Sequence, residues 1–220
     1  MTRMKSIFRW FLSNAALAAV VFLSAGKANP PILKMYLGVF AAITLIAALI
    51  ADPALFEERS NPGDTGLDPF SGTGITIFFL STVSVATMDA GRFHWTHDIT
   101  HLTQVTALVF VALFMGLQVW AMAVNPFFST AIRIQAEHGH SLVIHGPYRF
   151  IRHPGYFAML FNMPATAIAL GSRTALVPAV LCSLLILRRT IHEDRFLRHE
   201  LAGYAGYMLM VRYRLFPGLW

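Results

Sequence analysis

The feature that most constrains the fold is a series of long stretches without any Asp, Glu, Lys or Arg. The longest covers residues 102–124 and contains 23 residues. A helix needs about 20 residues to cross the hydrocarbon core of a membrane. We therefore predict six membrane-spanning helices. The corresponding stretches are 10–26, 35–51, 69–88, 102–124, 154–172 and 174–187.

The last of these stretches is only 14 residues long. We expect its helix to continue past Arg188 and Arg189, because the long stems of arginines let the charged groups reach the membrane surface. The basic segment before residue 10 has no convincing cleavage site, so the first helix is expected to be retained.

The overall composition agrees with a membrane protein. The chain is 56% hydrophobic and 13% charged, whereas a soluble domain carries about 25% charged residues. We therefore predict an all-α, polytopic membrane helical bundle. The single cysteine, Cys182, excludes a disulfide within the chain and a cysteine-based metal site.

Lysine and arginine are distributed unevenly between the two ends of the predicted helices. With the N-terminus inside, 13 of the 17 fall on the inner side, and only Lys27, Lys34, Arg92 and Arg173 fall outside. Cytoplasmic segments of membrane proteins carry such an excess. We therefore predict a multi-pass protein with both termini in the cytoplasm. This distribution also accounts for the net charge of +6 without a nucleic-acid partner.

The segment from His140 to Tyr156 is unusually polar for a connection between two spans. It contains three His, two Arg and two Tyr. Pro154 marks a helix start, because proline is tolerated at the first helical position. A helix start carries positive partial charge and unpaired N–H groups. With Arg152 and His153 just before it, this helix start is predicted to bind an anion such as a carboxylate.

A second polar group follows the sixth predicted span. Arg189 and Glu193 are four residues apart, so they share one face of a helix. An ordinary interfacial ion pair would explain them, but an acid at a membrane boundary is costly unless it is paired or functional.

Three motifs of the C-terminal part together resemble a known family. They are H-x-L-V-x-x-G-P-Y-R-x-x-R-H-P-x-Y from His140, R-x-x-x-E-[ED] from Arg189 and G-Y-x-x-Y-x-x-x-V-x-x-R-x-x-P from Gly203. The set resembles the isoprenylcysteine carboxyl methyltransferases and the related phospholipid methyltransferases. The resemblance divides the chain into residues 1–132, with four spans and the variable acceptor side, and a methyltransferase core at 133–220 with a basic C-terminal helix.

The resemblance implies that S-adenosylmethionine binds in a cytoplasmic pocket near the C-terminal half. It also implies that Arg189 faces the methyl acceptor and that Glu193 contacts the cofactor, which makes these two the candidate catalytic residues. No metal site is implied. The cofactor-binding residues that it indicates are His140, Ser141, Leu142, Val143, Gly146, Tyr148, Arg152, His153, Pro154, Gly155, Tyr156 and Glu193.

The acceptor stays open at this stage. An isoprenylcysteine-like carboxylate needs no base, whereas a phospholipid amine or a thiol must lose a proton. Glu193, His192 or His145 could take that proton. In either case we expect a lipid or small hydrophobic acceptor.

Two other functions remain compatible with the sequence. A membrane reductase of the sterol-reductase kind would use NADPH, whose 2′-phosphate would suit the arginines Arg188, Arg189, Arg195, Arg212 and Arg214. A non-enzymatic membrane protein would bind a haem or a metal through His94, His97 and His101. His97 and His101 are four apart and would share a helix face, although histidines that anchor a span end are the favoured explanation.

Overall fold

The computed structural model describes residues 3–26, 30–60 and 68–220. In this part of the chain the regular structure is entirely helical. The longer helices are α1 (Arg3–Ala25), α2 (Pro31–Ile50), α4 (Pro69–Met88), α5 (His101–Val124), α6 (Pro154–Ala169) and α7 (Leu176–Glu200). The shorter ones are α3 (Pro53–Ser60), α8 (Tyr204–Met210), the π-helix η1 (Asp89–Phe93) and the 3₁₀ turns η2 (Ala136–His138) and η3 (Gly146–Arg149).

Local sequence explains several helix boundaries. Asp68 caps α4 by accepting a hydrogen bond from the Ser71 backbone N–H, as an N-cap aspartate does. Pro154 begins α6, as its tolerance for the first helical position predicts. The predicted extension of the last long helix is confirmed, because α7 runs through Arg188 and Arg189 to Glu200.

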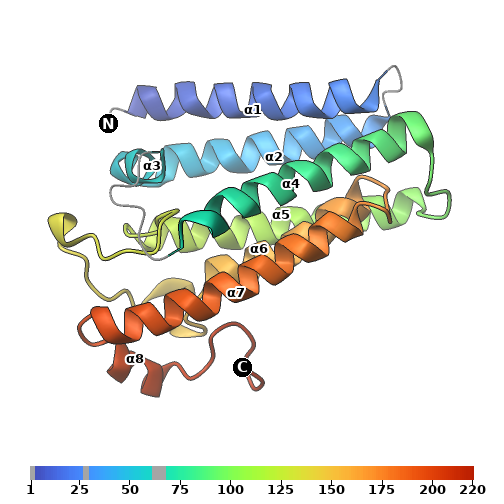
Figure 1. The fold of residues 1–220 in the computed structure, drawn as a ribbon. Coiled ribbons are helices and arrows are strands. Elements are labelled where there is room, and N and C mark those ends of the chain that lie inside the picture. Colours follow the sequence, from blue (N-terminus) through green and yellow to red (C-terminus); the bar gives the residue numbers. More distant parts are fainter. Residues whose placement is uncertain (1–2, 27–29, 61–67) are drawn as a thin grey trace.

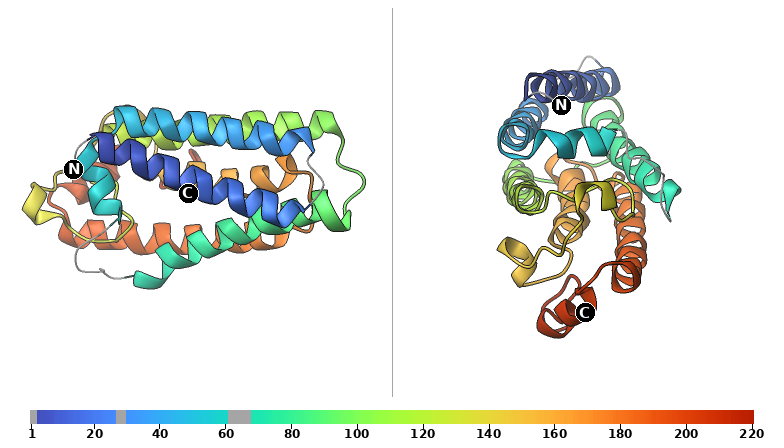
Figure 2. Two further views of the ribbon diagram at one scale, coloured as in Figure 1. Left: turned by 90° about the horizontal axis from the view of Figure 1, so that it is seen from above. Right: turned by 90° about the vertical axis from the view of Figure 1, so that its left-hand side faces the viewer.

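The long helices pack into one bundle in which each helix contacts the next around a closed ring (Figures 1 and 2). Helix α1 contacts α2 and α4, α2 contacts α5, α5 contacts α6, α6 contacts α7, and α7 contacts α4. Helix α6 also contacts α4. One hydrophobic core runs through the ring and includes Val21, Leu33, Val83, Val111 and Ile186.

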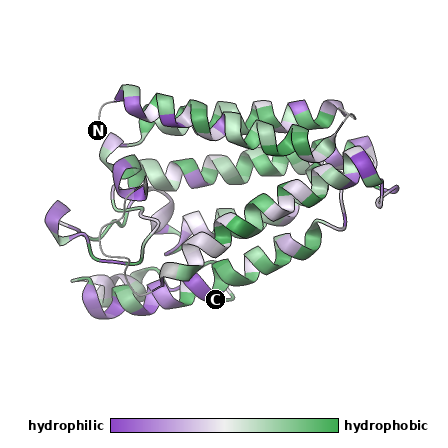
Figure 3. Cartoon of the chain, turned by 45° about the horizontal axis from the view of Figure 1, so that its top comes forward, coloured by the Kyte–Doolittle hydropathy of each residue, from purple (hydrophilic) through white to green (hydrophobic). Residues whose placement is uncertain are grey.

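Within the residues that the structure describes, four helices are long and apolar enough to cross a membrane, namely α1, α2, α4 with η1, and α5. Hydrophilic residues gather at the two ends of the bundle, and the long helices between them are mainly hydrophobic (Figure 3). The chain is an integral membrane protein on this evidence. Helix α6 has only 16 residues, so the complete set of six spans stays a prediction.

At one end of the bundle, the side chain of Asp89 holds several segments together. This carboxylate is fully buried and accepts hydrogen bonds from the Thr96 backbone and side chain, from Ser172 and from Thr174. It thereby ties the end of α4 to the turn between α6 and α7. We call this end, which holds Asp89 and the α6–α7 turn, the far end.

The far end contradicts one prediction. His97 and His101 do not share a helix face, because residues 94–100 are not helical and α5 begins only at His101. Nor do the ligand atoms of the three histidines gather, since the group of possible metal ligands found in the described residues is Glu58, Glu137 and His138. This arrangement removes the geometric basis for a three-histidine metal site.

The opposite end, which we call the pocket end, holds the N-terminus, α3, the connection between α5 and α6, and α8 (Figure 1). Two elements here differ from the predictions. The polar loop after the second span contains the short helix α3. The expected basic C-terminal helix is not a separate element: residues 188–200 continue α7, and α8 has seven residues without Lys or Arg, after which the chain turns back along α6.

The returning C-terminal segment is held by backbone hydrogen bonds. The N–H groups of Arg152 and His153 donate to the carbonyls of Tyr213 and Arg214. Leu215 is fully buried in the main core, and the Phe216 ring contacts Phe157 edge-on. The C-terminal segment is therefore an integral part of the pocket end.

Candidate active site

A cavity of about 190 Å³ lies at the pocket end, between the connection from α5 to α6 and helices α4, α6 and α7. Its lining includes ten of the twelve predicted cofactor-binding residues, as well as Arg189. These are His140, Ser141, Leu142, Val143, Tyr148, Arg152, His153, Gly155, Tyr156 and Glu193. Residues from four separate parts of the chain thus converge on one space.

The two remaining predicted residues have local structural roles. Pro154 begins α6. Gly146 has a φ of +59°, which glycine adopts without strain, and a side chain there would meet Val124. Both residues shape the backbone that carries the lining residues on either side of them.

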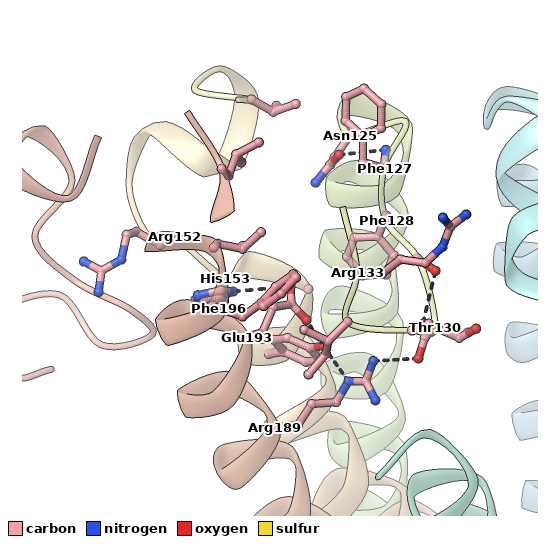
Figure 4. Close-up of a pocket in the computed structure, with 18 of the residues that line it drawn as sticks. Asn125, Phe127, Phe128, Thr130, Arg133, Arg152, His153, Arg189, Glu193 and Phe196 are labelled. Atoms are coloured by element: carbon pink, nitrogen blue, oxygen red, sulfur yellow. Dashed lines mark hydrogen bonds and ion pairs between the residues drawn. The ribbon is translucent and has the colours of Figure 1, made fainter. Parts of the chain in front are cut away.

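Arg189, Tyr156 and Glu193 form a connected chain of side chains along one wall, of which Figure 4 labels Arg189 and Glu193. The Arg189 Nε donates to the Tyr156 hydroxyl at 2.7 Å, and this hydroxyl donates to Glu193 Oε2 at 2.5 Å. Arg189 and Glu193 share a helix face, as predicted, but the tyrosine hydroxyl lies between them. Tyr156 therefore orients the carboxylate towards the cavity.

Arg189 is held from three directions. Its guanidinium also donates to the Ser71 hydroxyl of α4 and to the Thr130 carbonyl, both at 2.6 Å. Only 2% of the residue is exposed. A planar guanidinium bound at three nitrogens has a fixed orientation, so Arg189 presents a rigid positive group to the cavity.

Arg152 does not reach into the cavity in the way that the sequence suggested. Its guanidinium binds both carboxylate oxygens of Asp194 and the carbonyls of Val211 and Arg212. In Figure 4 it points away from Glu193 and Arg189. These contacts use the donors that a ligand carboxylate would need.

Asp194 organises the layer behind the cavity. It is 1% exposed and accepts hydrogen bonds from Arg152, His153, Tyr204 and Arg214. Burial alone would raise the pKa of this carboxyl, but the hydrogen bonds from His153 and Arg152 hold it well below its usual value. Asp194 is therefore a charged anchor for the C-terminal segment.

The motif histidine His140 also lines the cavity. Its ring stacks on Phe127 with 4.3 Å between the ring centroids, and its Nδ1 accepts from the Gln135 backbone N–H. Burial lowers the pKa of His140, which favours the neutral ring. Tyr148 is also buried, and burial raises the pKa of its hydroxyl.

Much of the remaining wall was not predicted from the sequence. Residues 125 and 127–133, between α5 and η2, line the cavity, and so do Gly72, Ile75 and Thr76 of α4. Tyr204 and Tyr207 also line it, although the third motif contained them without a role. The segment 125–133 offered little signal, because it has almost no regular structure.

Comparison with known protein families gives a match over part of the chain. Residues 105–199 match the model of the isoprenylcysteine carboxyl methyltransferase (ICMT) family. We call residues 105–199 the ICMT region. A comparison with curated proteins finds no match.

The ICMT region does not coincide with the part of the chain that carries the three motifs, residues 140–217. It begins within α5, 35 residues before His140, and ends at His199, before the third motif. It therefore includes the whole connection from α5 to α6, the α6–α7 hairpin and Glu193.

Proposed function

We propose that the protein transfers a methyl group from S-adenosylmethionine to a lipidic or small hydrophobic acceptor within the membrane. The observation that carries this proposal is the convergence of ten of the twelve predicted cofactor-binding residues on one cavity. These residues come from the ICMT region. The cavity also combines a carboxylate, an arginine and an apolar wall.

The cavity fits the methyl donor on chemical grounds. A carboxylate that is 25% exposed, Glu193, suits the ammonium or the sulfonium of the donor. The Phe127–His140 stack and Tyr148 offer aromatic surfaces for an adenine ring. For the donor carboxylate we propose the N–H groups at the start of α6, and we give Arg152 the role of holding His153 and Asp194 in place.

The bound donor supplies a methyl group on a positively charged sulfur, and transfer is an in-line displacement. The protein contributes by positioning the partners and excluding water. Arg189 orients the acceptor, since its guanidinium is fixed by Tyr156, Ser71 and Thr130. A carboxylate acceptor then needs no base.

An amine or thiol acceptor would give up a proton. Among the three candidate bases, Glu193 lines the cavity, whereas His145 and His192 are not among its described lining residues. His192 lies 4.0 Å from Asp68. We therefore propose Glu193 as the proton acceptor for such substrates.

The hydrophobic character of the acceptor is supported by the wall that α4 and α6 provide. Ile75 and Met159 line this part of the cavity, and Thr76 beside them is exposed on the surface of α4. A lipid chain is therefore expected to approach from the α4 side. We place the cavity on the cytoplasmic face, which is supported by the N-terminus and α8 lying at the same end of the bundle (Figure 1).

The reductase alternative receives less support. Of its five arginines, only Arg189 is among the described lining residues of the cavity. Arg214 pairs with Asp194, and Arg188 pairs with Asp68. The other arginines of the lining are engaged within the protein: Arg59 donates to the Phe128 carbonyl, Arg133 pairs with Glu58, and Arg152 pairs with Asp194.

The direct test is isothermal titration of the detergent-purified protein with S-adenosylmethionine and, in parallel, with NADPH. We expect binding of the first alone. Labelled methyl groups should then appear in lipid extracts that are incubated with the protein. Binding of NADPH alone would reject the proposal.

A further inference from the structure

The helix α3 lies outside the ICMT region, yet it contacts the cavity wall through two consecutive residues. It is anchored to the bundle by Leu55, which is buried against Ala51 and Met122. Its last turn then presents Glu58 and Arg59 towards the segment 125–135. This arrangement places a rigid helix directly behind an irregular part of the wall.

Glu58 makes the stronger of the two connections. Its carboxylate accepts two hydrogen bonds from the Arg133 guanidinium, at 3.0 and 2.6 Å, and a third from the Ser129 hydroxyl at 2.9 Å. The Glu58 side chain is 7% exposed and that of Arg133 is 15% exposed. A bidentate pair in such a shielded place is geometrically specific and strong.

Arg59 adds a second connection one residue later. Its guanidinium donates to the Phe128 carbonyl and lies over the Phe128 ring. Its own carbonyl accepts from the Thr130 hydroxyl. Because segment 125–135 has almost no regular secondary structure, these contacts with α3 determine much of its conformation.

The same segment contacts the candidate active site from its other side. The Phe128 ring packs so closely on Gly155 that a side chain there would overlap it. The Thr130 carbonyl accepts from Arg189, and the Gln135 N–H donates to His140. The residues held by Glu58 thus alternate along the chain with residues that contact the site.

We propose that Glu58 is a positioning residue for the candidate active site, which holds segment 125–135 in the conformation that the cofactor pocket requires. We refer to its contacts with Arg133 and Ser129 as the α3 clamp. The inference rests on the proposed function for its effect on the methyl donor, but the clamp itself is a property of the protein without ligand.

A metal at this position is the competing explanation, because Glu58, Glu137 and His138 offer ligand atoms close to one another. The Arg133 guanidinium already occupies the position between the two acids, at 2.6 Å from Glu58 and from Glu137. A cation is therefore supplied by the chain. The clamp needs no added ion.

Arg133 also provides a matched control. It pairs with the buried Glu58 on α3 and with Glu137, whose side chain is 51% exposed and which lies four residues further along, in η2. Glu58→Gln removes the ion pair that joins Arg133 to α3. Glu137→Gln removes an ion pair of the same kind that lies wholly within the connection between α5 and α6.

The experiment combines hydrogen exchange of the purified, ligand-free protein with titration of S-adenosylmethionine. Glu58→Gln should increase amide exchange in residues 125–135 and weaken donor binding roughly tenfold, as expected when a charged hydrogen bond is lost. In turnover assays the KM for the donor should rise, with kcat changed less than about threefold. Glu137→Gln should leave exchange and affinity at wild-type values.

If Glu58→Gln does not fold, Arg133→Gln tests the same clamp from the loop side. Wild-type exchange and affinity in a folded Glu58→Gln or Arg133→Gln protein would overturn the inference. Equal effects of Glu58→Gln and Glu137→Gln would also overturn it. If the wild-type protein binds no S-adenosylmethionine, the proposed function fails, and hydrogen exchange alone decides whether the clamp exists.

Discussion

Two consecutive acids of α7 have opposite environments. Glu193 is 25% exposed and faces the cavity, with one hydrogen bond from Tyr156. Asp194 is 1% exposed and accepts hydrogen bonds from four side chains. Consecutive residues of a helix point about 100° apart, so one acid contributes to the cavity and the other to the layer behind it.

Adjacent positions in one motif therefore have different roles. The Glu193 carboxylate can still accept hydrogen bonds from a ligand, because it has few partners within the protein. Asp194 has its bonding capacity filled by donors from the start of α6, α8 and the C-terminal segment. We therefore expect mutation of Asp194 to affect stability and mutation of Glu193 to affect binding.

The largest effect should follow from Asp194→Asn. The change leaves the buried guanidinium of Arg152 without its counter-charge, and breaking a buried ion pair in this way costs about 3–5 kcal/mol. Thermal unfolding in detergent measures the loss. Asp98→Asn is the control, because Asp98 pairs with Arg173 at an exposed site, where such pairs contribute about 0–1 kcal/mol. Equal losses in the two variants would contradict the anchoring role.

Glu193→Gln should have the next largest effect, and on donor binding rather than on stability. The amide keeps the shape of the side chain but removes its charge. A hydrogen bond to a charged group contributes about 1.5–3 kcal/mol, so donor affinity should fall about 10- to 100-fold. Titration with S-adenosylmethionine measures it, and the unfolding temperature should stay at the wild-type value. Unchanged affinity would assign Glu193 to a structural role.

Tyr156→Phe should have a smaller effect. It removes the hydroxyl between Arg189 and Glu193 and leaves the ring in place. Loss of one such hydrogen bond costs about 1 kcal/mol, so turnover should fall about fivefold. Tyr213→Phe serves as the control, because Tyr213 is not among the described lining residues. Equal turnover in the two variants would show that the hydroxyl does not orient the site.

The smallest difference concerns pH. The hydrogen bonds to Asp194 lower its pKa in the folded protein from the ordinary value of 3.8. Its contribution to stability is therefore fully present above about pH 4 and is lost as the pH falls towards the folded pKa. The stability gap between the wild type and Asp194→Asn should stay constant from about pH 5 to 8 and shrink only below about pH 4. Unfolding series at several pH values check this, and a gap that narrows near neutral pH would contradict it.

Local signals in the sequence were sufficient for most helix boundaries. The charge-free stretch 69–88 coincides with α4, and Pro154 begins α6. The prediction that α7 continues past Arg189 succeeded because arginine stems tolerate a membrane boundary. Such features depend on neighbouring residues, and the amino-acid sequence displays them directly.

Contacts between distant segments were not predictable in the same way. The role of Asp194 depends on Arg152, Tyr204 and Arg214, which lie on separate segments, and no local pattern joins them. For the same reason Arg152 was expected to bind a ligand carboxylate, although it faces Asp194. The helix α3 was hidden in a polar loop, because only eight residues form it.

The buried carboxylate of Asp89 gives the bundle unequal ends. It joins α4 to the α6–α7 turn at the far end, while the pocket end is bounded by irregular segments. Helix α6 connects the two ends over about 24 Å, at 1.5 Å for each of its residues. Its first turn carries Tyr156 of the cavity, and its last residue lies three positions before Ser172, which donates to Asp89. The tyrosine that holds Glu193 and the turn that holds Asp89 are therefore joined by a single helix.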